Sequence, residues 1–129
     1  MSIQETITGL QHVGIPTDNL DATIAFYKDL GFETAGIFPN GANQCAFLKR
    51  DNLTIETWTG DQTVKETGAI NHLSLNSTNI EETFAAAKAM DLQLVDQSIQ
   101  SIPSFWDNGI RYFNILGPNN ETIEFCEIL

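Results

Sequence analysis

The sequence is short of basic residues, cysteines and long apolar runs, and each shortage excludes a class of protein. Six Lys and Arg stand against seventeen Asp and Glu, so the formal net charge is -11 at pH 7. Such a charge repels a nucleic-acid backbone and an anionic membrane surface, so neither is expected as a partner. The same charge favours cationic ligands and divalent metal ions.

The two cysteines, Cys45 and Cys126, are too few for a disulfide framework. The N-terminus shows no apolar signal stretch, and no uncharged apolar run is long enough to span a membrane. Together these absences predict a cytoplasmic protein whose thiols stay reduced. Cys126 follows Glu124 by two residues, so a strand there would place both side chains on one face. A small buried hydrophobic side chain is the simpler interpretation of this cysteine.

The sequence does contain an internal repeat. The residues around His12 align with those around His72, and these are the only two histidines of the chain. Near the end of each half, residues 52–56 align with residues 120–124 and are identical at four of five positions. The sequence therefore indicates a duplicated architecture with one imidazole and one carboxylate in each copy.

Each half follows the order strand, helix, then several strands. A strand candidate at 8–15 precedes a helix that Asp18 or Asn19 caps and that runs to Leu30. One apolar face is expected on each helix, made of Leu20, Ile24, Tyr27 and Leu30 in the first copy and Ile80, Phe84, Ala87 and Met90 in the second. Further strands are expected at about 32–38, 44–49 and 53–58, and then at about 93–99, 110–115 and 121–127.

The chain is predicted to form one domain over residues 1–129. Its two modules are expected at about 7–58 and 69–128. Residues 59–68 between them are polar, with Val64 as the one aliphatic side chain, and are expected to form a connector.

Strand parity indicates whether the two His and two Glu of the repeat can act together. Successive side chains of a strand point to opposite faces, and next to each of these four residues the opposite face is apolar. The amphipathic helices are expected to cover the apolar faces, which leaves the His and Glu side chains on a concave ligand surface. Four ionisable groups facing one another without a metal would be costly, so the pattern predicts a metal site. Its ligands are His12, Glu56, His72 and Glu124. Hydrogen-bonded histidines with solvated glutamates remain the alternative.

Two imidazoles and two carboxylates suit divalent Ni, Zn, Co or Mn, with Fe less expected, and do not suit Cu(I) or calcium. On an octahedral ion, four protein ligands leave two positions open for two neighbouring oxygens of a substrate. Chelation there would polarise a carbonyl and acidify the adjacent C–H for removal by a carboxylate base.

Candidates for substrate binding lie close to these strands. Trp58 shares the face of Glu56 by strand parity. Residues 97–109 form a loop longer than a hairpin turn and carry Phe105 and Trp106, which either cover a pocket or pack against a neighbouring subunit. Arg111 is the candidate anchor for an anionic group, although a surface role also fits it.

These features together resemble the vicinal oxygen chelate superfamily, which includes glyoxalase I, extradiol dioxygenases and bleomycin-binding proteins. The resemblance rests on the strands with His12, Glu56 and His72, the helix segment at 20–32, and the close at 117–125. It implies an α+β fold, in which paired βαβββ modules form a curved eight-stranded mixed sheet around the metal. It also implies a homodimer.

Within that superfamily the full set of four ligands looks most like bacterial glyoxalase I. The likeness implies a metal-dependent lyase or isomerase of the lactoylglutathione lyase type, in which Glu124, or alternatively Glu56, shuttles the proton. The chain departs from that pattern at residues 15–17 and 57–60, where glyoxalase I enzymes tend to carry an Arg and an Asn that serve glutathione. A small substrate other than a glutathione adduct is therefore favoured.

Two alternatives remain open from the sequence. A non-catalytic, antibiotic-like binding protein of the same fold would use an acidic cup walled by Trp58, Phe105 and Trp106 for a cationic or aromatic molecule. A small Fe(II) dioxygenase would need an acid–base group, for which Tyr112 is the one candidate, although a packed strand tyrosine is the simpler interpretation of this residue.

Overall fold

The computed structural model describes residues 2–129 and divides into two compact units, Met1–Thr63 and Val64–Leu129. The division lies inside the stretch expected to connect the two modules. The first unit carries two helices and the second carries one among the described residues, and each unit has one mixed sheet, so the fold is α+β as expected. Among the described residues, no helix has the length and apolarity that crossing a membrane requires.

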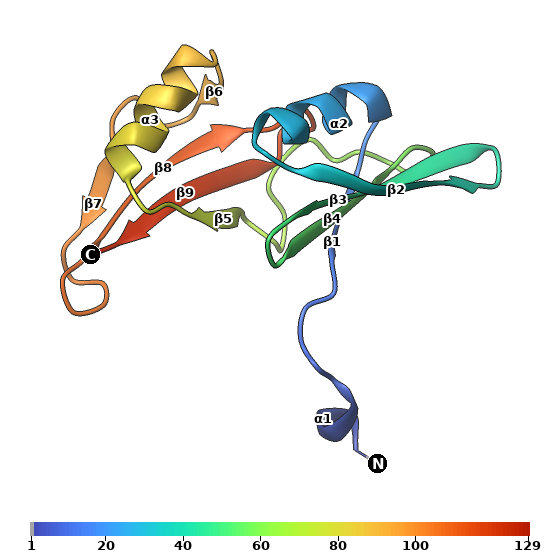
Figure 1. The fold of residues 1–129 in the computed structure, drawn as a ribbon, viewed down its shortest axis with the longest axis horizontal. Helices are drawn as coiled ribbons and strands as arrows, with labels where there is room; N and C mark the ends of the chain where they lie inside the picture. Colours follow the sequence, from blue (N-terminus) through green and yellow to red (C-terminus); the bar gives the residue numbers. More distant parts are fainter. Residues whose placement is uncertain (1) are drawn as a thin grey trace. The chain divides into compact units, whose positions relative to one another are not determined.

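The first unit contains a short N-terminal helix followed by a βαβββ arrangement (Figure 1). Its elements are α1 (Ile3–Thr6), β1 (Val13–Pro16), α2 (Leu20–Asp29), β2 (Glu33–Asn40), β3 (Asn43–Arg50) and β4 (Leu53–Trp58). The strand order is β1-β4-β3-β2, with β1 parallel to β4 and the other neighbours antiparallel. Helix α2 lies along one face of this sheet.

The second unit repeats this arrangement with one strand more. Its elements are β5 (Leu73–Asn76), α3 (Ile80–Ala89), β6 (Gln93–Leu94), β7 (Gln100–Ile102), β8 (Ile110–Leu116) and β9 (Thr122–Ile128). The strand order is β5-β9-β8-β6, and β7 also pairs with β8. As in the first unit, the strand before the helix runs parallel to the last strand.

Several strand boundaries differ from the sequence expectation. The first strand begins at Val13 and not at residue 8, so His12 precedes it, and His72 likewise precedes β5. The strand expected at 93–99 ends at Leu94 because the Asp96 carboxylate accepts a hydrogen bond of 2.8 Å from the backbone N–H of Asn114. The Asp96 side chain thus binds the Asn114 N–H, which the backbone of a longer strand would otherwise bind. The described residues form nine strands, where eight were expected.

The first helix is capped by Asn19, one of the two residues expected there, and the second is capped by Asn79 at the equivalent position of the repeat. Asn19 accepts a hydrogen bond of 3.0 Å from the Ala22 N–H, and Asn79 accepts one of 3.2 Å from the Glu82 N–H. The buried helix residues include Leu20 and Tyr27 in α2 and Ile80 and Ala87 in α3. Met90 was expected on the apolar face of the second helix, but it is the C-cap and is 42% exposed.

The faces of the sheets follow the predicted parity. In β4 the side chains of Ile55 and Thr57 are fully buried on the side that packs against α2, and Glu56 between them points away. In β9 Ile123 is buried, and Glu124 next to it is turned to the other face. Helices α2 and α3 therefore each cover one face of their sheet, and the other face carries the repeated pair of one His and one Glu.

Candidate metal centre

The first unit brings His12 and Glu56 together on the sheet face away from α2. The parallel pairing of β1 with β4 sets Gly14 opposite Glu56, and His12 lies two residues before Gly14 on the same face. His12 Nε2 and Glu56 Oε1 are 3.7 Å apart, and the two side chains are 37% and 28% exposed. They form the first His–Glu pair, which water and small ligands reach.

The second unit builds an equivalent pair from His72 and Glu124. The register of β5 with β9 sets Ser74 opposite Glu124, and His72 lies two residues before Ser74. His72 Nε2 is 3.9 Å from Glu124 Oε2, with side-chain exposures of 39% and 16%. The same sequence positions therefore produce the same geometry in both units.

An amide residue orients each imidazole. His12 Nδ1 hydrogen bonds to the side-chain oxygen of Gln11, and His72 Nδ1 lies 2.8 Å from the side-chain oxygen of Asn71. An amide oxygen only accepts, so a proton on Nδ1 completes each of these hydrogen bonds and leaves Nε2 on the side of the glutamate. This is the orientation in which a histidine ligates a metal through Nε2.

The chemistry of each pair fits a divalent cation. The Nε2 and carboxylate oxygen atoms are 3.7 Å and 3.9 Å apart, which is too far for a hydrogen bond. An imidazole nitrogen and a carboxylate oxygen are both atoms that ligate divalent cations. Metal bonds to N and O of about 2.1 Å each are long enough to bridge such a gap.

Each unit by itself offers two donors. Among residues 2–129 no group of three or more His, Cys, Asp or Glu side chains is arranged for a metal ion. Structural and catalytic metal sites use three or four protein ligands. The two donors of one unit are therefore too few to hold an ion tightly.

The surroundings of the first pair are largely aromatic. The Phe47 ring meets the His12 ring edge-on with centroids 5.7 Å apart. A Cβ added at Gly14 would lie 3.1 Å from the Trp58 ring and 3.9 Å from Glu56 Oε1, so the glycine leaves room between the indole and the carboxylate. The Trp58 N–H donates a 2.6 Å hydrogen bond to Asp61, which holds the ring in place.

A cysteine thiol also contacts the first pair. Cys45 lies opposite Trp58 in the β3–β4 ladder, and its Sγ is 3.5 Å from Glu56 Oε2. Burial raises the pKa of the Cys45 thiol, and the hydrogen bond and the negative charge of Glu56 raise this pKa further. The thiol therefore stays protonated and donates to the carboxylate.

The surroundings of the second pair are polar. The Ser74 hydroxyl donates a 2.7 Å hydrogen bond to Glu124 Oε1 and lies 3.1 Å from Cys126 Sγ. Tyr112 pairs with Cys126 in the β8–β9 ladder, so it shares the face of Glu124. Glu124 thus has one oxygen bound to a hydroxyl and the other turned toward His72.

Some substrate-binding candidates lie elsewhere. Arg111 is three residues from Asn114, the partner of Glu124, so its side chain leaves the opposite face of the sheet and binds Glu81 of α3 at 2.5 Å. It does not face the second pair. Phe105 and Trp106 lie in the turn after β7 and are 49% and 69% exposed.

Sequence reasoning did not identify Gln11, Asn71, Cys45 or Ser74 as parts of the site. The first two had a signal, because an amide residue immediately precedes the histidine in both copies. The other two had none, because their contacts depend on which strand pairs with which.

Comparison with known families gives one match over most of the chain. Residues 11–102 match the model of the Glyoxalase/Bleomycin resistance protein/Dioxygenase superfamily. The uncharacterized protein YwbC of Bacillus subtilis is 31% identical over 125 residues, which cover 92% of this chain and 96% of YwbC.

Solved structures share the fold at low sequence identity. A glyoxalase family protein from Enterococcus faecalis superposes with a TM-score of 0.77 at 22% identity, over 92% of this chain and 97% of that one. The fosfomycin resistance protein FosX from Listeria monocytogenes, in complex with Mn(II) and sulfate, gives 0.74 at 18% identity, over 95% and 94%.

Proposed function

Because the chain belongs to the Glyoxalase/Bleomycin resistance protein/Dioxygenase superfamily, we propose that it binds one divalent metal ion through His12, Glu56, His72 and Glu124. We propose further that it is a glyoxalase I-type lyase or isomerase, acting on a small substrate that chelates the metal through two adjacent oxygens. The repeated His–Glu pair carries this proposal.

Each pair by itself is two donors short of a full set, and the two together make four. Two imidazoles and two carboxylates suit Ni, Zn, Co or Mn. A related fold that holds Mn(II), in the Listeria FosX, supports a divalent ion in this architecture.

The mechanism assigns distinct tasks to the protein side chains. The bound metal would polarise a chelated carbonyl and so acidify the neighbouring C–H. Glu124 removes that proton and returns it to the adjacent carbon, and Glu56 is the alternative base. The Ser74 hydroxyl, 2.7 Å from Glu124 Oε1, fixes the orientation of the carboxylate. The Cys45 thiol fixes the orientation of the Glu56 carboxylate in the same way. The Trp58 ring borders the first His–Glu pair beside Gly14.

A second candidate function is non-catalytic binding of a cationic or aromatic molecule. The Trp58 ring beside the open space at Gly14, with the Phe47 ring on the other side of His12, favours it. The metal distinguishes the two, because the binding function does not require one.

The test is metal content and affinity in the full-length protein. Wild type, stripped and titrated with Mn(II), Ni(II) or Zn(II), is expected to bind about one ion per chain. His72→Ala and Glu124→Gln are expected to weaken binding at least about tenfold, since a lost ligand costs no less than a lost orienting partner. Glu82→Gln, an exposed carboxylate on α3, is the matched control and should bind as wild type does.

Catalytic activity is then measured on the metal-loaded protein. Hemithioacetals formed from methylglyoxal and several thiols should be isomerised by wild type and not by Glu124→Gln. Wild type that binds no divalent ion would contradict the proposed function. A loaded protein that turns over none of these adducts, yet binds cationic aromatic compounds tightly, would favour the binding protein.

A further inference from the structure

The position of one lysine bears on the substrate class. The chain has six basic residues, namely Lys28, Lys49, Arg50, Lys65, Lys88 and Arg111. With a net charge of -11, any basic side chain beside a His–Glu pair is a notable source of attraction for an anion. Strand register and contacts decide which of the six is placed there.

Neither arginine points toward a His–Glu pair. Arg50 donates a 3.1 Å hydrogen bond to the carbonyl oxygen of Gly31 at the end of α2, where it offsets the negative end of the helix dipole. Arg111 binds Glu81 on the helix-covered side of the second sheet.

The other lysines are also placed elsewhere. Lys28 and Lys88 lie in the last turns of α2 and α3, and the Lys88 ammonium sits 5.2 Å from the centre of the Phe84 ring. Lys65 lies in the segment between β4 and β5, outside the strands. Lys49 is therefore the basic residue whose strand register gives it the face of a His–Glu pair.

Lys49 is the diagonal neighbour of Glu56 across the β3–β4 ladder. Phe47 is directly opposite Glu56, and Lys49 lies two residues further along β3, opposite Thr54. Cβ atoms of such diagonal partners are about 7–8 Å apart, within reach of a long side chain. The path from His12 past the Phe47 ring to Lys49 therefore follows one face of the sheet.

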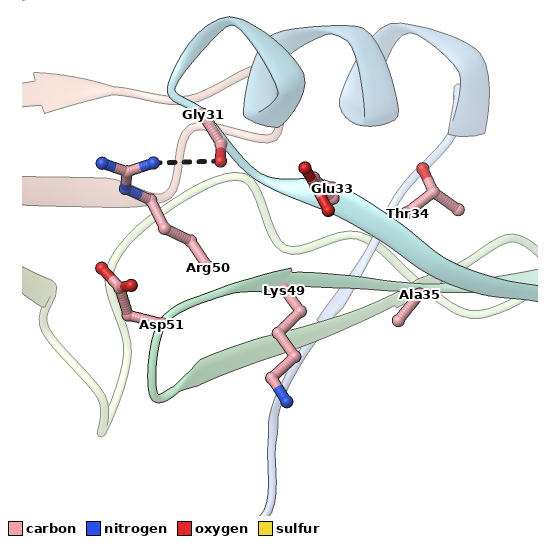
Figure 2. A pocket seen from close by; sticks show the side chains of 7 residues that line it. All are labelled: Gly31, Glu33, Thr34, Ala35, Lys49, Arg50 and Asp51. Atoms are coloured by element: carbon pink, nitrogen blue, oxygen red, sulfur yellow. Dashed lines mark hydrogen bonds between the residues drawn. The ribbon is translucent and has the colours of Figure 1, made fainter.

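The Lys49 ammonium makes no hydrogen bond or ion pair in the described part of the chain, and its side chain is exposed. Glu33 is its direct partner across the β2–β3 ladder, yet the two form no ion pair. Figure 2 shows Lys49 pointing away from Arg50, which turns toward Gly31. Both border a hollow of about 370 Å³ at the edge of the sheet, together with Glu33 and Asp51.

We infer that Lys49 binds a carboxylate of the substrate and that the substrate is an anionic oxygen chelator. This inference rests on the proposed function, because the chelating end of the substrate is held at the metal. Glu33 and Asp51 oppose an anion in the free protein. A divalent ion on Glu56 reverses the local charge, so that metal and Lys49 attract the two ends of one molecule.

The experiment compares two chelators on the Mn(II)-loaded protein. Catechol and protocatechuate both offer two adjacent oxygens, and only protocatechuate carries a carboxylate. Calorimetry on wild type should show a preference for protocatechuate that falls as salt is added. Lys49→Met should reduce this preference by about fivefold, the upper range for an exposed ion pair, and leave catechol affinity unchanged.

Three further variants serve as controls. Lys49→Arg should keep the preference, and Lys28→Met, with the same charge change on α2, should behave as wild type. Glu33→Gln should increase the preference, because it removes the negative charge directly across the β2–β3 ladder from Lys49. A preference that Lys49→Met leaves intact would overturn the inference.

The metal affinity of wild type shows whether the proposed function fails, independently of the Lys49 variants. If no ion binds, the proposed function fails, and the same two compounds are compared on the metal-free protein, where a preference for protocatechuate that Lys49→Met removes would support the contact with Lys49 by itself. Binding of neither compound, with or without metal, would contradict the assignment of Lys49 to the substrate.

Discussion

At the scale of single residues, the two His–Glu pairs differ in what supports the carboxylate. Glu56 accepts from the Cys45 thiol at 3.5 Å, and Glu124 accepts from the Ser74 hydroxyl at 2.7 Å. A hydroxyl is the stronger donor, so Glu124 is the more firmly oriented carboxylate. In the proposed reaction, this difference favours Glu124 as the base.

The Cys45 thiol gives a pH-dependent test of the first pair. Its pKa is raised, so it stays protonated at a pH where a free thiol has begun to ionise, and alkylation by iodoacetamide should rise only at higher pH. Glu56→Gln removes the charge that raises this pKa and should speed alkylation severalfold near pH 9. Burial, the largest cause, persists, so the rate should stay below that of a free thiol.

Mass spectrometry of the Cys45 peptide over a pH series measures these rates. Glu82→Gln, which removes a distant carboxylate, should leave the profile unchanged. An unchanged profile in Glu56→Gln would show that the thiol does not contact this carboxylate in solution.

At the scale of secondary structure, the repeat extends to the start of both helices. The Thr17 hydroxyl lies 2.9 Å from that of Thr23, and in the second unit Ser77 lies 2.8 Å from Thr83. Asparagine caps occupy equivalent positions, so the start of the first helix, expected at Asp18 or Asn19, is confirmed and recurs in the second unit. Strand ends were predicted less well, because their limits depend on partners that are distant in sequence, as Asp96 and Asn114 show.

Removal of a cap should lower stability by a known amount. Asn79→Ala deletes the acceptor for the Glu82 N–H at the start of α3, and is expected to reduce the free energy of unfolding by about 1 kcal/mol. Urea denaturation measures this change. Asn108→Ala, at an exposed turn position with no side-chain hydrogen bond among the described residues, should change it by less than about 0.5 kcal/mol. Equal effects in both variants would rule out a capping contribution.

At the scale of the whole molecule, the proposed function assigns all four ligands to one ion. We expect His12→Ala and His72→Ala each to abolish tight metal binding, and the double variant to be no weaker than either single one. Residues that act on one ion are not additive. Independent sites in the two units would instead leave half the wild-type stoichiometry in each single variant, as isothermal titration would reveal.

A mixture of the two single variants then shows where the site is built. If all four ligands come from one chain, no binding returns on mixing. If they come from two chains of a homodimer, the hybrid keeps one intact set of ligands and binding returns in part. Coexpression with two affinity tags isolates the hybrid for this measurement.

The sequence by itself determined the repeat, the α+β fold, the pairing of each His with its Glu, and the apolar face behind each glutamate. These follow from periodicity and local spacing, because side-chain direction alternates along a strand. Only the tertiary structure decided which face Arg111 and Lys49 occupy. That choice depends on the register between strands, which turns such as Gly117–Asn120 and Asp51–Asn52 set, with Asn120 and Asp51 at positive φ. A shift of one residue would exchange the two faces, so spacing within a single strand leaves the anion anchor undetermined.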